Sequence, residues 1–189
     1  MVKTYLAIFA GLGLVMALVA DFFQDRERRK PGPAAIEPGS HFAASSLFLT
    51  TVTVAALDIG RFHWTHGLAE TMQILALVVF AFAASIQVWA MAVNPFFSTV
   101  IRLQTDRGHR LATRGPYRFI RHPGYLAMAI IMPATAIALG SVLALVPGLC
   151  YSALILWRAN REDGFLTEQL AGYSAYAERV RYRLIPSLW

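Results

Sequence analysis

The sequence predicts an all-α, polytopic membrane protein with about five transmembrane helices. Of its 189 residues, 57% are hydrophobic and only 15% are charged, which leaves too little polar surface to cover a soluble globule. The apolar residues gather in blocks whose lengths approach the roughly 20 residues that a helix needs to cross a bilayer. The single cysteine, Cys150, excludes an intramolecular disulfide and a multi-cysteine metal site.

Residues 1–93 are predicted to form three N-terminal transmembrane helices. The first apolar block is Tyr5–Phe23, for which a cleaved signal peptide is the alternative. The second block is Phe42–Ile59, rich in Thr, Ser and Ala, and the third is Leu68–Val93. Asn94-Pro95 follows the third block directly, and proline breaks a helix. We therefore expect this helix to end at residue 93.

Residues 94–189 combine a polar loop, a further apolar region and a charged tail. The apolar region Tyr125–Trp157 is divided by Gly140-Ser141, so we expect its two halves to form a helical hairpin. The segment Ala159–Arg183 has the apolar spacing of an amphipathic helix. Its spaced apolar residues are Phe165, Leu166, Leu170, Tyr173 and Tyr176. We expect this helix to lie on the cytosolic membrane face or to fold back over the core.

The positions of the basic residues predict the orientation in the membrane. All 17 Lys and Arg residues except Lys3 and Arg61 fall in Asp21–Gly39, in Arg102–Arg121 or after Trp157. Basic residues near the ends of spans stay on the cytoplasmic side, so with five spans the N-terminus is outside and the C-terminus is cytosolic. The net charge of +6 is then mainly a topology signal that also attracts membrane lipid head groups. Nucleic-acid binding is not expected.

The loop Arg102–Arg121 contains six arginines and one acid, Asp106. Such a cluster requires negative partners, and both the Glu162-Asp163 pair in the tail and a small ligand with a carboxylate or phosphate satisfy this requirement. Arg158 and Glu162 lie four residues apart on one helical face. They form either a surface ion pair or an arginine that orients an anionic substrate beside a carboxylate that holds a polar cofactor.

These residues belong to a series of motifs that resembles the isoprenylcysteine carboxyl methyltransferase family of integral membrane enzymes. The motifs occur in the family's order from Asn94 to the C-terminus, roughly half of the chain. They are Asn94-Pro-Phe-Phe97, Asp106-Arg-Gly-His109, Thr113-Arg-Gly-Pro-Tyr-Arg118, Arg121-His-Pro-Gly-Tyr125, Leu139-Gly-Ser141, Arg158-Ala-Asn-Arg-Glu-Asp163, Gly172-Tyr-Ser-Ala-Tyr176 and Arg181-Tyr-Arg-Leu-Ile-Pro186. The first three predicted spans carry no such motif.

The resemblance implies S-adenosyl-L-methionine as methyl donor, bound on the cytosolic side and largely enclosed by the C-terminal segment. It implies that Arg158 orients the acceptor and that Glu162 serves both catalysis and cofactor binding. The cofactor-binding positions that it implies are Gln104, His109, Leu111, Ala112, Tyr117, His122, Tyr125 and Glu162. The family often has two adjacent glutamates where this chain has Glu162-Asp163, so the second acid is shorter here. No metal site is expected.

The function that follows is methyl transfer to a lipophilic acceptor that enters from the bilayer, with a carboxylate favoured over a thiol or an amine. Sterol reductases, which use a nicotinamide cofactor, are similar in the C-terminal half and give an alternative enzyme class. A non-catalytic membrane scaffold is a third possibility. The sequence predicts no oligomeric state.

Overall fold

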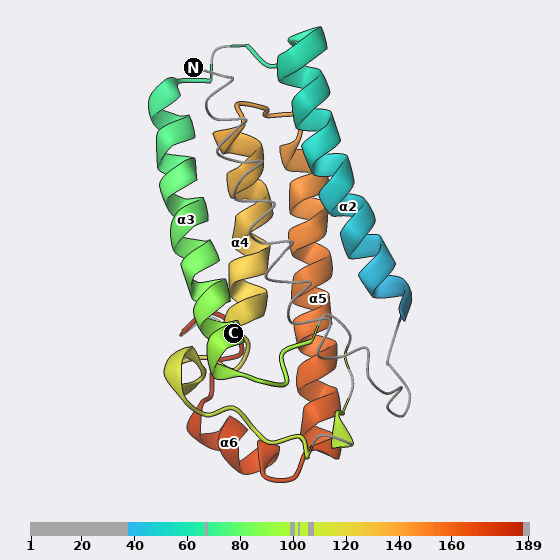
Figure 1. The fold of residues 1–189 in the computed structure, drawn as a ribbon, viewed down its shortest axis with the longest axis vertical. Coiled ribbons are helices and arrows are strands. Elements are labelled where there is room, and N and C mark those ends of the chain that lie inside the picture. The colour runs from blue at the N-terminus through green and yellow to red at the C-terminus, as the bar shows by residue number, and fades with distance from the viewer. Residues whose placement is uncertain (1–37, 67, 99–100, 102, 106–107, 187–189) are drawn as a thin grey trace.

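The computed structural model describes residues 38–186 apart from 67, 99–100, 102 and 106–107 (Figure 1). Within this part of the chain every regular element is a helix, which confirms the all-α prediction for it. The first predicted span, Tyr5–Phe23, lies outside the described residues.

Helices α2 (Pro38–Leu57) and α3 (Glu70–Val93) are long and apolar enough to cross a membrane. A π-helical turn, Asp58–Phe62, extends α2, so the apolar stretch runs over Gly39–Phe62. Both helices present large apolar side chains outward, with Phe42 76% and Phe82 68% exposed. Contiguous apolar surface of this kind is unfavourable in water and marks a membrane or protein partner.

Asn94-Pro95 ends α3 as the sequence predicts. The backbone of Asn94 is extended, and its side-chain Oδ1 accepts a hydrogen bond from the backbone N–H of Phe96 at 3.0 Å. This side-chain turn replaces the next helical hydrogen bond. It directs the chain from α3 into the polar loop.

Helix α4 (Pro123–Ala138) lies between α3 and α5 (Leu145–Gln169) (Figure 1). Its buried face is made largely of small side chains, among them Ala127, Ala134 and Ala136, which allow neighbouring helices to approach closely. With 16 residues, α4 is shorter than the two long apolar helices. The predicted break after it is confirmed, because Gly140 adopts a left-handed φ of 89° just past the end of α4.

The predicted boundary between the last apolar helix and a separate amphipathic helix is wrong. Helix α5 does not end near Trp157 but runs without a break from Leu145 to Gln169, 25 residues in all. Residues 158–169 are mostly charged or polar and contain a single glycine, Gly164, and charge alone does not interrupt helical hydrogen bonding. The helix stops before Gly172, whose φ of 82° starts a turn. The short helix α6 (Tyr173–Arg179) then folds back under the bundle (Figure 1).

At the opposite end of the bundle, Asp58 is fully buried. Its carboxylate accepts hydrogen bonds from Thr65, through N–H at 2.7 Å and Oγ1 at 2.5 Å, and from Ser141 Oγ at 2.5 Å. Ser141 Oγ also accepts from the N–H of Ala144 at 3.1 Å. One carboxylate thus joins the end of α2, the following loop and the turn between α4 and α5.

Candidate functional site

The polar loop folds against the end of α3 through a tight turn at Gly115. Gly115 has φ +57°, and a Cβ there would lie 2.9 Å from Val93 Cγ2, so no other residue fits without displacement. Pro116 then begins a short 3-10 helix, Gly115–Arg118. The turn buries Tyr117, whose hydroxyl accepts a hydrogen bond from Asn94 Nδ2 at 3.3 Å and whose carbonyl accepts one from Tyr176 Oη at 2.7 Å.

The next turn places His122 at the start of α4. Pro123 occupies the first turn of the helix, where its missing N–H costs nothing. A Cβ at Gly124 would clash with the ring of Phe97, so this glycine lets the segment after α3 pack against the N-terminus of α4. His122 is buried and stands edge-on to Tyr125, with ring centroids 5.8 Å apart.

These turns and the C-terminal half of α5 enclose a pocket. It lies between the loop on one side and α5 with α6 on the other. Seven of the eight positions expected to contact a cofactor line this one pocket: His109, Leu111, Ala112, Tyr117, His122, Tyr125 and Glu162. Further lining residues are Phe96, Phe97, Arg121, Met128, Leu166, Leu170, Tyr173 and Tyr176. The apolar stripe of the tail therefore faces this pocket.

Gln104, the eighth expected position, does not line the pocket but lies fully buried behind it. Its backbone N–H donates to His109 Nδ1 at 3.2 Å, and its side-chain Nε2 donates to the carbonyl of Phe96 at 3.0 Å. Phe96 stacks on the ring of His109 at 4.6 Å. Gln104 thus holds two residues of the pocket wall in place.

Arg158 is not a surface residue and does not line the pocket. It is 4% exposed, and its Nη1 donates to Ser40 Oγ on α2 at 3.0 Å. The expectation of a solvated Arg158–Glu162 surface pair is wrong, because α2 and α4 cover this part of α5. Arg158 also lies within hydrogen-bond reach of the Tyr125 hydroxyl, which donates to Glu162 Oε2 at 2.6 Å. Tyr125 therefore connects Arg158 to Glu162.

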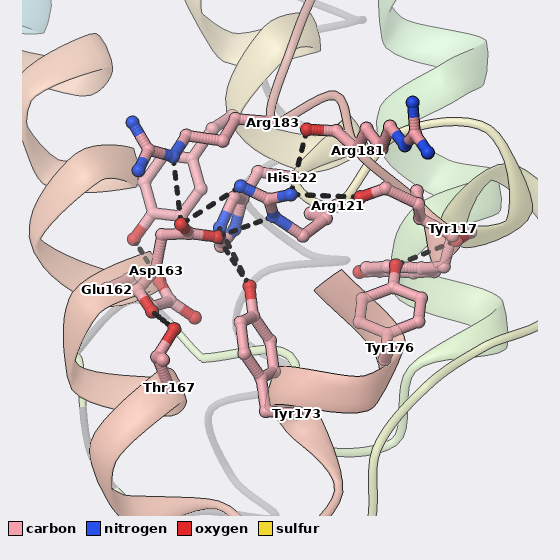
Figure 2. Close-up of polar contacts among 12 residues, drawn as sticks. Tyr117, Arg121, His122, Glu162, Asp163, Thr167, Tyr173, Tyr176, Arg181 and Arg183 are labelled. Atoms are coloured by element: carbon pink, nitrogen blue, oxygen red, sulfur yellow. Dashed lines mark hydrogen bonds and ion pairs between the residues drawn. The ribbon is translucent and has the colours of Figure 1, made fainter. Parts of the chain in front are cut away.

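Asp163 accepts hydrogen bonds from four side chains (Figure 2). Arg121 binds it in a bidentate manner, with Nε to Oδ1 at 2.8 Å and Nη2 to Oδ2 at 3.1 Å. Tyr173 Oη donates to Oδ1 at 2.7 Å, His122 Nε2 lies 3.1 Å from Oδ1, and Arg183 Nε donates to Oδ2 at 2.8 Å. We call these five residues the Asp163 cluster.

The Asp163 cluster fixes the charge of its central carboxylate. Burial by itself would raise the pKa of Asp163, but hydrogen bonds from His122, Arg121 and Tyr173 outweigh it and hold this pKa far below its usual range. Burial, reinforced by the negative charge of Asp163, raises the pKa of the Tyr173 hydroxyl. Asp163 is therefore ionised and Tyr173 is neutral at physiological pH.

Sequence reasoning assigned no role to Arg121, Tyr173 or Arg183 and left that of Asp163 open. The excess of arginines in the loop is the sequence feature that indicates a role for Asp163, because the tail acids are one of the two candidate partners of these arginines. The structure brings the loop and the tail acids together, since Arg121 of the loop binds Asp163. The pocket also remains available to a polar ligand, so the two alternatives are compatible.

The pocket combines groups suited to a zwitterionic ligand with an aromatic part. Glu162 offers a carboxylate, His109 and His122 offer ring nitrogens, and Arg110 offers a cation. The tyrosine rings offer faces that accept a sulfonium or ammonium group. Among the described residues, no group of three or more His, Cys, Asp or Glu side chains is arranged to bind a metal ion.

The comparisons with known proteins all indicate the same family. The model of the isoprenylcysteine carboxyl methyltransferase (ICMT) family matches residues 74–168, just over half of the chain. Two curated relatives, each called probable protein-S-isoprenylcysteine O-methyltransferase, come from Oryza sativa subsp. indica and subsp. japonica. Each is 34% identical over 90 residues, which cover 44% of this chain and 45% of the relative. The matched region thus spans less than half the length of these relatives.

The lowered pKa of Asp163 predicts how its stabilising effect depends on pH. Its contribution is fully present above the unfolded-state pKa, about 3.8, and is lost only as the pH falls through the lower folded-state value. The difference in melting temperature between wild type and Asp163→Asn should be constant from about pH 8 to pH 5 and shrink below about pH 4. Thermal unfolding in detergent at each pH measures it.

Glu168→Gln is the matched control, because it removes a carboxylate from an exposed position of the same helix. A melting difference that already shrinks between pH 7 and pH 5 would show that Asp163 titrates near neutrality and would contradict the prediction.

Proposed function

Because the chain belongs to the isoprenylcysteine carboxyl methyltransferase family, we propose that it is an S-adenosylmethionine-dependent membrane methyltransferase with a lipophilic carboxylate acceptor. The observation that carries the proposal is the convergence of His109, Tyr117, His122 and Glu162 on one pocket. The first three lie close together in the sequence, within residues 109–122, and Glu162 comes from α5, 40 residues after His122. Residues 94–189 then form the catalytic half, and the N-terminal helices shape the lipid-side entrance.

The chemistry of the pocket fits the methyl donor. Glu162, held by Tyr125, suits the hydroxyl or ammonium groups of the donor, and the surrounding tyrosine faces tolerate its sulfonium charge. Leu111, Ala112 and Leu166 supply apolar contacts for an adenine ring. When bound, S-adenosylmethionine supplies an electrophilic methyl group, and the protein supplies alignment.

The acceptor side of the proposal centres on Arg158. A guanidinium presents a planar fork of donors that matches a carboxylate, and Arg158 is held in place by Ser40 and by the cover of α2. A carboxylate is already ionised at neutral pH, so the site needs no general base. Tyr125 interacts with both Arg158 and Glu162, which supports an acceptor-orienting group close to a donor-binding group.

Exclusion of water is the remaining requirement of the site. The negative acceptor and the positive donor neutralise each other during methyl transfer, and they attract each other more strongly where water is excluded. Tyr173 and Tyr176 on α6 form one wall of the pocket and are both 2% exposed. Leu184, fully buried against Tyr125, Ile155 and Ala159, anchors the tail over the same region. These contacts support an enclosed reaction chamber.

Variants of the two functional side chains separate donor binding from acceptor orientation. Glu162→Ala should abolish S-adenosylmethionine binding, because it removes the carboxylate of the pocket. Arg158→Ala should leave the affinity for S-adenosylmethionine within about two-fold and lower turnover by about 100-fold or more, since orientation of a reactant contributes several kcal/mol to a barrier. Isothermal titration in detergent measures the affinities, and transfer of isotopically labelled methyl to lipid extracts, followed by mass spectrometry, measures turnover.

The control for these variants is Glu168→Gln, which should bind and turn over as wild type does. Titration with NADPH tests the reductase alternative in the same preparation. Equal S-adenosylmethionine affinity in wild type and Glu162→Ala, or binding of NADPH in place of S-adenosylmethionine, would reject the assignment.

The proposed topology has five spans, with a hairpin of α4 and α5 as the last two, the N-terminus outside and the pocket in the cytosol. It is supported by the distribution of charge along the bundle. Arg110, Arg114, Arg118, Arg161 and Arg179 all belong to the end that holds the pocket, whereas Arg61 belongs to the Asp58 end. Retention of basic residues on the cytoplasmic side favours this orientation.

Single cysteines test the orientation in intact cells that express a Cys150→Ser background. His66→Cys, in the exposed loop beside Asp58, should react with a membrane-impermeant maleimide from outside. Glu178→Cys, exposed on α6, should react only after the membrane is permeabilised. The reverse labelling pattern would place the pocket on the outer side and contradict the topology.

A further inference from the structure

Asp163 lies behind the pocket wall. Three of its four partners, Arg121, His122 and Tyr173, line the pocket, whereas Asp163 does not. The side chain of Asp163 is 6% exposed. Asp163 can therefore affect a ligand in the pocket only indirectly, and these three side chains are one route by which it does so.

The hydrogen bonds of the cluster define which nitrogen of His122 carries a hydrogen. An ionised carboxylate only accepts hydrogen bonds, so His122 Nε2, 3.1 Å from Asp163 Oδ1, must carry its hydrogen. The Tyr173 hydroxyl donates to the same oxygen and lies 3.3 Å from Nε2, so its oxygen faces the same N–H. In the neutral ring Nδ1 is then the nitrogen that accepts a hydrogen bond from a ligand.

The same carboxylate ties the C-terminal segment to the loop. Arg183 follows α6 and binds Asp163 from the tail, while Arg121 binds it from the loop. The backbone N–H groups of Arg121 and His122 donate to the carbonyls of Tyr182 and Arg183, both at 2.9 Å. Arg121 Nη1 also donates to the carbonyls of Val180 and Arg181, both at 2.9 Å. The tail therefore runs along the loop, and one arginine from each of these two segments binds the carboxylate of Asp163 (Figure 2).

We propose that Asp163 is a positioning residue for the donor site: it fixes the tautomer and orientation of His122 and clamps residues 180–183 of the tail against the loop before the donor binds. The proposal rests on the proposed function and adds to it a residue that never touches the ligand. Helix α5 thereby contributes two acids with separate tasks, since Glu162 faces the pocket and Asp163 faces the cluster.

A double-mutant cycle distinguishes positioning from simple stabilisation. The variants are Asp163→Asn, His122→Ala and the pair, with Glu168→Gln as the control that removes one carboxylate from the exposed face of α5. Asp163→Asn should raise the dissociation constant for S-adenosylmethionine by about ten-fold or more, as expected when a charged hydrogen-bond partner is lost from a buried network. In the His122→Ala background the same change should raise this constant by a clearly smaller factor, because the part of the effect that acts through His122 is already lost and only that of the tail clamp remains.

The clamp is measured without any cofactor. Trypsin cleavage after Arg181 of the full-length, cofactor-free protein in detergent should become about ten-fold faster in Asp163→Asn than in wild type or Glu168→Gln. If Asp163→Asn does not fold, Arg183→Gln tests the clamp through a partly exposed residue, and Tyr173→Phe tests the His122 contact with a ring of the same shape. Arg183→Gln should accelerate trypsin cleavage, and Tyr173→Phe should raise the dissociation constant for S-adenosylmethionine.

Equal weakening by Asp163→Asn in both backgrounds would overturn the His122 part of the proposal, and unchanged cleavage would overturn the clamp. If the wild type binds no S-adenosylmethionine, the proposed function fails, while the proteolysis still decides the clamp. If the wild type binds and Asp163→Asn changes neither measurement, the proposed function stands and the inference about Asp163 fails.

Discussion

The continuity of α5 past its apolar part is the constraint on which the site depends. The same helix packs against α4 and α2 and then carries Glu162 and Asp163 beyond them to the polar loop. Adjacent residues on an α-helix point about 100° apart, so the two acids face different neighbours. Glu162 meets Tyr125 at the pocket, and Asp163 meets the loop and the tail. A break at Trp157 would separate both acids from the packed part of the helix.

Buried carboxylates secure both ends of the bundle, in different ways. The Asp58 carboxylate is stabilised by hydrogen bonds from uncharged donors, the N–H and hydroxyl of Thr65 and the hydroxyl of Ser141, and it holds loops together. Asp163 is paired with two guanidinium groups and two ring side chains, several of which also line the pocket. An unpaired buried charge is strongly destabilising, so each arrangement specifies its partners closely. Of the two, only the partners of Asp163 also form the wall of a pocket, so the need to pair its buried charge also positions pocket residues.

Much of the fold follows from local signals in the sequence. The end of α3 at Asn94-Pro95, the start of α4 at Pro123 and the turn at Gly140 are set by proline and glycine, whose backbone preferences act without tertiary context. The predicted length of α5 is wrong because a change from apolar to charged residues does not by itself end a helix. Composition marks where a helix leaves the apolar region, not where its hydrogen bonding stops.

The site residues also fall into two groups: those that local sequence motifs predict and those whose roles depend on contacts with distant segments. Seven of the expected cofactor-binding positions meet at one pocket. Five of them belong to motifs with their own turn or helix face, and Leu111 and Ala112 lie in the short link between two such motifs. The role of Gln104 behind His109 and the burial of Arg158 beneath α2 were not predictable, since each depends on a distant segment. The Asp163 cluster was hidden for the same reason. Its formation requires the extended tail after α6, which has no periodic pattern, to run beside residues 121 and 122.

The central claim is that the loop and the C-terminal half of α5 form one chamber for a methyl donor. An experimental structure of the protein saturated with S-adenosylhomocysteine, the demethylated form of the donor, tests it most directly. The account predicts a ligand enclosed among Tyr117, His122 and Glu162, with a polar atom within hydrogen-bond distance of the Glu162 carboxylate. A ligand bound elsewhere on the protein, or an empty chamber at saturating concentration, would contradict it.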